Sequence, residues 1–194
     1  MLDAIERGRD EDEIRARADE IARLASSAPT AYARDARVYG TWRMVWSAQD
    51  RTANAFQRVL SGLAVNYQII APSVVTNVAK FGWFEVEARA TSEVLSDSKI
   101  AVVIREVDVK AFGAVVKTIA LTPKPGAGEG WVEQMYVDDE FRVSVGNKGS
   151  LFCHVKEKGK EMKSLEAATA TAVAATASST ALARVADDEE NVVP

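Results

Sequence analysis

Residues 38 to 156 form a succession of short segments that are rich in β-branched and aromatic residues and are separated by turn residues. Within several segments the side chains alternate in character, as where Phe84 and Val86 alternate with Glu85 and Glu87. Alternation with a period of two places one set of side chains on each face of a strand. The segments that predict strands are residues 38–47, 64–70, 74–78, 84–89, 99–107, 115–121, 131–137, 141–145 and 151–155.

The spacing of these segments limits the possible folds. Many short strands at intervals of roughly 8–12 residues, with no helical pattern between them, are typical of an antiparallel barrel or sandwich. The turn sequences at 138–140 and 146–149 favour tight hairpins between the last three strands. We expect a barrel, since closure leaves no strand edge exposed and encloses a cavity. The chain is therefore predicted to be mainly β, with one antiparallel β-barrel.

A helical pattern precedes the strands. Residues 10–25 begin with Asp10 and Glu13 at the spacing of a capping box. The apolar stripe of this segment consists of Ile14, Ala18, Ile21 and Leu24. The other faces carry charges of both signs, whereas a membrane-surface helix is rich in Lys and Arg there. We therefore predict an N-terminal amphipathic helix that packs its stripe against the strands.

The composition changes again after residue 160. Residues 167–183 are rich in Ala, Thr and Ser, and an acidic cluster follows at 187–190. Such a segment has few large apolar side chains to bury, so it cannot order itself without external contacts. We predict an extended C-terminal tail that is either a docking arm or disordered. The expected divisions are an N-terminal helical segment at 1–30, the barrel domain at 31–160 and the tail at 161–194.

Charge and hydropathy exclude two classes of protein. The 194-residue chain carries 24 Lys and Arg against 28 Asp and Glu, for a net charge of −4. A nucleic-acid partner would favour a basic surface, so none is expected. No apolar run reaches the roughly 18 residues that a membrane-spanning helix needs. The single cysteine, Cys153, excludes an intramolecular disulfide.

The residues do not form a set that is typical of a catalytic or metal site. The only histidine, His154, follows Cys153 on a predicted strand, so the two side chains point to opposite faces. Zinc needs about four converging ligands, and a Cys–His nucleophilic pair needs two side chains in contact. We expect a buried Cys153 thiol and a surface His154 imidazole. No catalytic residue, metal site or enzymatic activity is predicted.

Aromatic side chains are spread through the predicted strands. They include Trp42, Trp46, Phe84, Trp131, Phe141 and Phe152. Large apolar side chains fill the core of a small barrel, and they also line the pockets of proteins that bind lipophilic ligands. The pattern alone leaves both interpretations open.

Two stretches resemble one known family. Gly40 and Trp42 form a G-x-W motif that is followed by an alternating apolar run, which is similar to the first strand of the plastid lipid-associated proteins, or fibrillins. Residues 130–143 resemble the closing hairpin of that family. They lead into residues 146–152, Gly-Asn-Lys-Gly-Ser-Leu-Phe, which resemble its last turn and strand.

The resemblance implies a lipocalin-like antiparallel β-barrel. It also implies that Trp42, on the first strand, packs under Arg142, from the last strands, and closes one end of the barrel. An arginine over an indole ring is a cation–π contact worth roughly 0.5–2 kcal/mol. Together with the alternation along the strands, the resemblance favours a lipophilic pocket. Its expected lining is Trp42, Met44, Trp46, Phe84 and Val86.

The function that the resemblance implies is that of a non-enzymatic chloroplast protein, peripheral to thylakoids or plastoglobules. Such a protein binds or organises prenyl lipids, carotenoids, quinones or other pigments, and no covalent cofactor is expected. The expected partners are these lipophilic small molecules, together with the thylakoid membrane surface or subunits of photosynthetic complexes.

Two other hypotheses remain. The first is a structural accessory subunit of a thylakoid photosystem–antenna complex, for which the Ala/Thr-rich tail is the docking arm. The second is an enzyme that acts on a prenyl lipid, and the lack of an acid/base set counts against it.

Overall fold

The computed structural model of the chain describes residues 1–8, 10–26, 31–48, 64–122 and 129–158. The elements are the helices α1 (Leu2–Glu6) and α2 (Glu11–Ser26), the 3-10 turns η1 (Tyr32–Arg34) and η2 (Ala36–Val38), and the strands β1 (Gly40–Ala48), β2 (Val65–Ala71), β3 (Val74–Phe81), β4 (Phe84–Val94), β5 (Lys99–Ala111), β6 (Ala114–Ala120), β7 (Glu129–Val137), β8 (Phe141–Gly146) and β9 (Leu151–Lys156). Within these residues, nine antiparallel strands confirm the mainly β prediction. The predicted tail at 161–194 lies outside the described residues. None of the described helices is long and apolar enough to cross a membrane.

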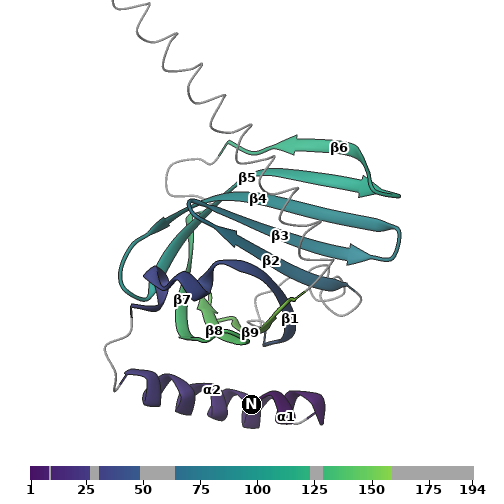
Figure 1. Cartoon of the computed structure of the whole chain (residues 1–194). Helices are drawn as coiled ribbons and strands as arrows, with labels where there is room; N and C mark the ends of the chain where they lie inside the picture. The colour runs from purple at the N-terminus through teal and green to yellow at the C-terminus, as the bar shows by residue number, and fades with distance from the viewer. Residues whose placement is uncertain (9, 27–30, 49–63, 123–128, 159–194) are drawn as a thin grey trace, which may run out of the picture.

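The strands form one sheet that closes on itself (Figure 1). Their order is β4-β3-β2-β1-β9-β8-β7-β5, and β4 also pairs with β5, which completes a ring. Among the described strands, β6 pairs with β5 alone and lies outside this ring. The ring has an interior on which alternate side chains of each strand converge.

Both β4 and β5 are longer than the alternation predicts. They continue to residues 94 and 111, where the sequence pattern predicts ends at 89 and 107. Arg89 on β4 pairs with Glu106 and Asp108 on β5. Opposite charges across a strand pair stabilise the pairing. These charged residues therefore lie within the two paired strands instead of ending them.

The helices cover the outer face of the sheet at β7, β8, β9 and β1 (Figure 1). Ala18 of α2 is completely buried and packs in one cluster with Val143 and Cys153. Ile14 is buried as well, but Leu24 is 56% exposed, so the predicted stripe is confirmed only at its start. Because Val143 and Cys153 face the helices, the residues that alternate with them face the interior of the ring.

A bulge reverses the alternation of β1. The pairing of β1 with β9 shifts between Met44 and Trp46, which leaves Val45 as an extra residue. Val45 and Trp46 therefore pack in the outer cluster beneath the helices. The prediction that Trp46 lines the pocket together with Trp42 and Met44 is wrong for this reason.

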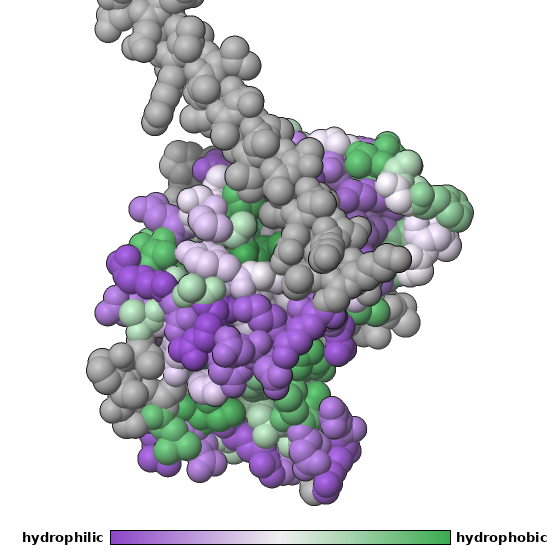
Figure 2. All heavy atoms as spheres, viewed as in Figure 1, coloured by the Kyte–Doolittle hydropathy of each residue, from purple (hydrophilic) through white to green (hydrophobic). Residues whose placement is uncertain are grey.

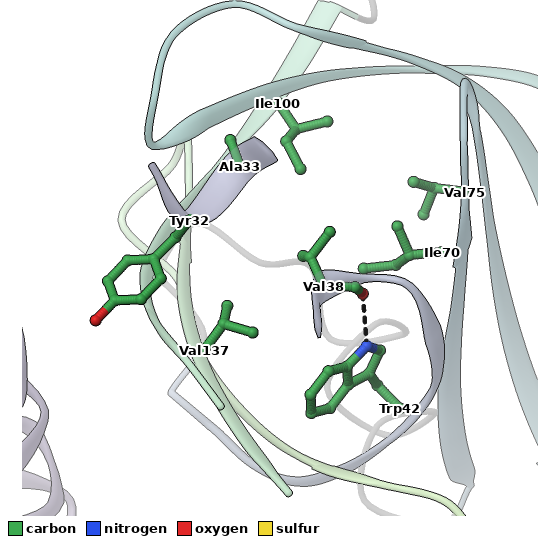
Figure 3. Packing of buried hydrophobic residues seen from close by; sticks show 8 residues of the cluster. All are labelled: Tyr32, Ala33, Val38, Trp42, Ile70, Val75, Ile100 and Val137. Carbon is green, nitrogen blue, oxygen red and sulfur yellow. Dashed lines mark hydrogen bonds between the residues drawn. The ribbon is translucent and has the colours of Figure 1, made fainter. Parts of the chain in front are cut away.

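The apolar core inside the ring surrounds Trp42, which is completely buried. It packs in one cluster with Tyr32, Ala33, Val38, Ile70, Val75, Ile100 and Val137 (Figure 3). The indole Nε1 donates a hydrogen bond to the carbonyl oxygen of Val38, at 2.8 Å. The turns η1 and η2 thus supply side chains that fill one end of the ring, and we call this set the Trp42 cluster.

Replacing Trp42 with alanine is expected to lower the free energy of unfolding by roughly 3–5 kcal/mol. The change removes a large buried side chain and leaves the Val38 carbonyl without its donor. Trp83→Ala is the matched control, because Trp83 is 61% exposed and its loss should change stability by about 1 kcal/mol, the value of one exposed ring contact. Urea denaturation of both variants measures the difference, and equal midpoints would contradict it.

Candidate ligand cavity

A cavity of about 350 Å³ lies inside the ring. Its lining residues come from all strands of the ring and are Met44, Asn66, Tyr67, Gln68, Asn77, Val78, Ala79, Val86, Ala88, Val102, Val132, Ser144, Phe152 and His154. The volume falls at the lower end of the range of small-molecule sites, roughly 300–1,000 Å³. The ring is therefore filled at one end and hollow beyond it.

Positions along β2 place the cavity relative to the Trp42 cluster. Ile70 belongs to that cluster, whereas Gln68 and Asn66, two and four residues earlier on the strand, line the cavity. Side chains two residues apart on a strand share a face, so the cavity begins directly beside the filled end. It extends towards the end of β3 and the start of β4, where Val86 lines it.

The walls of the cavity are largely apolar. The apolar side chains that line it include Met44, Val86, Val102, Val132 and Phe152. They come from five strands, β1, β4, β5, β7 and β9. Walls of this kind favour the hydrocarbon part of a ligand over water.

Arg142 lies at the boundary between the cavity and the Trp42 cluster. It is completely buried, and its guanidinium carbon is 5.2 Å from the centre of the Trp42 ring, a cation–π contact. Its Nη2 donates to Oε1 of Gln68 at 2.6 Å, and Nε2 of Gln68 donates to Oδ1 of Asn77 at 2.9 Å. A chain of polar groups thus crosses the ring from β8 to β3 and separates the apolar cluster from the cavity.

Three side chains on β8 and β9 carry buried polar atoms that have no hydrogen-bond partner among the described residues. These atoms are Nε and Nη1 of Arg142, Oγ of Ser144 and Nδ1 of His154. Arg142 and Ser144 are two residues apart on β8, and His154 lies opposite Arg142 on β9. All three therefore belong to the face that points into the ring, where Ser144 and His154 line the cavity. We call them the polar end of the cavity.

Burial determines the charge of these groups. Burial and the neighbouring Arg142 cation lower the pKa of His154 well below its ordinary 6.5, so the imidazole is neutral at pH 7. Burial also lowers the pKa of Arg142 to about 9, which leaves the guanidinium charged at pH 7. The polar end therefore carries one positive charge.

The surface position predicted for His154 is wrong, because this side chain is only 4% exposed. One face of β9 points towards the helices and carries Cys153, and the other points into the ring and carries His154. Neither face is open to water. The buried Cys153 thiol is confirmed.

The residues predicted for the pocket occupy three different places. Met44 and Val86 line the cavity, and Trp42 lies at its filled end. Trp46 lies in the outer cluster because of the bulge in β1. Phe84 packs against other aromatic rings at the start of β4, and it is not among the residues that line the cavity.

The sequence interpretation missed the polar lining. Arg142 and Ser144 alternate with Phe141, Val143 and Val145 along β8. Such alternation is typical of a strand with one face in water. The signal for a polar stripe is thus present in the sequence, but only the closed ring shows that this stripe faces an interior.

The fold and the cavity place this protein in the class of closed antiparallel sheets with an internal cavity of ligand size. The family model of PAP_fibrillin matches residues 4–154, and the chain belongs to this family. Proteins of this family are generally plastid-associated, and they are generally non-enzymatic, lipid-associated structural proteins. No curated protein and no solved structure matches the chain.

The stability of the fold is expected to fall as the pH drops below 6.5. The unfolded chain binds a proton on His154 near that pH, whereas the folded chain, with its lowered pKa, does not. Between pH 6.5 and about 5 the free energy of unfolding should decrease with a slope approaching about 1.4 kcal/mol per pH unit. His154 is the only histidine, so His154→Gln should remove this slope. Urea denaturation at several pH values measures it, and a flat profile for the wild type would contradict the prediction.

Proposed function

We propose that this protein binds a lipophilic molecule with one acyl or prenyl chain, or one quinone ring, inside the ring of strands. The observation that carries the proposal is the cavity of about 350 Å³ with apolar walls on five strands. Membership of a lipid-associated family supports the same class of ligand. A volume at the lower end of the usual range favours a single chain over a bulky lipid or a complete carotenoid.

The proposed place of action is the plastid, peripheral to thylakoids or plastoglobules, and the proposed role is non-enzymatic. Family membership supports both statements. The alternative of an accessory subunit in a photosystem–antenna complex depends on the tail at 161–194, which lies outside the described residues. The cavity is the feature that favours ligand binding over a purely structural role.

A second candidate function is contact with a lipid surface, and two exposed aromatic residues favour it. Trp83 in the β3–β4 turn is 61% exposed, and Phe112 in the β5–β6 turn is 82% exposed. Their rings stack with centres 4.9 Å apart, and the N–H of Phe112 donates to the carbonyl of Trp83 at 2.8 Å. Apolar side chains gather at this end of the sheet (Figure 2). We call this pair the aromatic tip.

The aromatic tip lies at the same end of β4 as Val86, a residue that lines the cavity. Phe84 lies two residues before Val86 on the same strand, and Trp83 directly precedes Phe84 in the chain. Phe112 has a φ of 50°, a left-handed conformation that is unfavourable for a residue with a Cβ. Exposed aromatic rings are typical of sites that meet the boundary between lipid and water. A lipid surface bound by the tip would lie next to the cavity.

Filling the cavity should abolish binding of a neutral lipophilic dye. Ala88 lines the cavity, so Ala88→Phe is expected to weaken binding of Nile red at least tenfold by occupying the space. Val116→Phe is the matched control, since Val116 lies on β6 and is 62% exposed. Fluorescence titration measures both, with circular dichroism to verify folding. If the wild type shows no saturable binding, or if the two variants bind alike, the proposal is wrong.

Removing the aromatic tip should weaken binding to vesicles. The double variant Trp83→Ser, Phe112→Ser is expected to reduce co-flotation with phosphatidylcholine vesicles at least fivefold, since it removes the two exposed rings. Leu95→Ser is the control, because Leu95 is 56% exposed and lies in the turn at the opposite end of β4. Equal flotation of the wild type and the double variant would refute this second function.

A further inference from the structure

Arg142 is a buried cation that forms no ion pair within the described part of the chain. Burial lowers its pKa, and among the residues that the structure describes no carboxylate opposes that effect. Arg89 is less buried, yet it pairs with the three carboxylates of Glu87, Glu106 and Asp108. A buried charge without a counter-ion is strongly destabilising. The uncompensated Arg142 therefore requires an explanation.

The contacts by which Arg142 closes one end of the ring use only some of the atoms of its guanidinium group. The guanidinium lies over the Trp42 ring, and the hydrogen bond to Gln68 uses Nη2. The N–H groups at Nε and Nη1 remain without an acceptor among the described residues.

The two neighbouring side chains of the polar end also have buried polar atoms without a hydrogen-bond partner among the described residues. Ser144, with 1% exposure, and His154, with 4%, line the cavity beside Arg142 and carry unpaired atoms. A serine hydroxyl donates one hydrogen bond, and neutral imidazole donates one from whichever nitrogen carries the proton. Ser144 and His154 thus line the same end of the cavity, and the charged Arg142 lies beside them on the inner face, at the boundary of the cavity.

We infer that Arg142, Ser144 and His154 form a head-group site that binds the carboxylate of a single-chain acidic lipid such as a fatty acid. The inference rests on the proposed function, that the cavity holds a lipophilic chain. Both oxygens of a carboxylate accept hydrogen bonds, and those from a guanidinium are charge-assisted and strong. The bound anion supplies the counter-ion that Arg142 lacks.

The site fixes the direction of the ligand. The carboxylate lies at the inner end, beside the Trp42 cluster, and the chain passes Met44 and Phe152 towards Val86 at the outer end. The aromatic tip is on that outer side, so the chain enters with its charged group first. A quinone would use the same donors through a neutral carbonyl oxygen, and the charge of the head group distinguishes the two ligands.

The test compares dodecanoate with dodecanol, which have the same chain and differ in the head group, by displacement of Nile red. The wild type should bind dodecanoate roughly 10- to 100-fold more tightly, as expected for a charge-assisted hydrogen bond. Arg142→Gln should lose this preference and still bind dodecanol. Lys148→Gln is the matched control, because it removes an exposed positive charge in the β8–β9 turn and should leave the preference intact.

A second measurement uses only the wild type and does not depend on the folding of the variants. The carboxyl carbon of ¹³C-labelled dodecanoate, followed by NMR as a function of pH, should titrate at a lower pH when bound than when free, since Arg142 stabilises the anion. Equal affinity for acid and alcohol, tighter binding of a short-chain quinone, or an unshifted titration would overturn the carboxylate site. Such results would leave the proposed function intact, whereas failure to bind any of these ligands would overturn the proposed function itself.

Discussion

Hydrogen bonding between β4 and β5 closes the sheet, and the interior of the molecule exists because of it. The ladder runs from the pair of Phe84 and Ala111 to the pair of Val94 and Ile100, with one irregularity beside Arg89. Closure gives every strand of the ring an inner face. Arg142 and His154 would face water on an open sheet, but here they are buried. The cavity, its charge and the pKa shifts are all consequences of this closure.

The interior is divided into two parts by the size of its side chains. At one end, Trp42 and the residues of η1 and η2 fill the space, and a hydrogen bond to Val38 fixes the indole. Beyond Arg142 and Gln68 the inward side chains are smaller, among them Ala79, Ala88 and Ser144, and a cavity remains. The apolar core and the cavity therefore lie one after the other along the axis of the same ring of strands. The filled end provides stability, and the hollow end provides space for a ligand.

The polar end of the cavity has an energetic cost that a ligand can reduce. Unpaired buried donors are unfavourable in the free protein, because each has lost its hydrogen bonds to water. A ligand that accepts those hydrogen bonds stabilises the folded state and gains affinity from the same contacts. The aromatic tip lies at the end of β4 where Val86 lines the cavity, so the two proposed functions, ligand binding and contact with a lipid surface, are compatible in one protein.

The sequence by itself determined the strands, the amphipathic helix, the buried cysteine and the family, because periodicity, turn residues and local motifs are properties of neighbouring positions. It did not determine that Trp46 leaves the inner face, since that depends on the register between β1 and β9. Nor did it show that His154 is buried, because the second face of β9 becomes an interior only when β4 and β5 meet. Tertiary structure alone placed Arg142, Ser144 and His154 together, each with a buried polar atom that has no hydrogen-bond partner among the described residues, since these positions come from two strands whose shared inner face is created by closure.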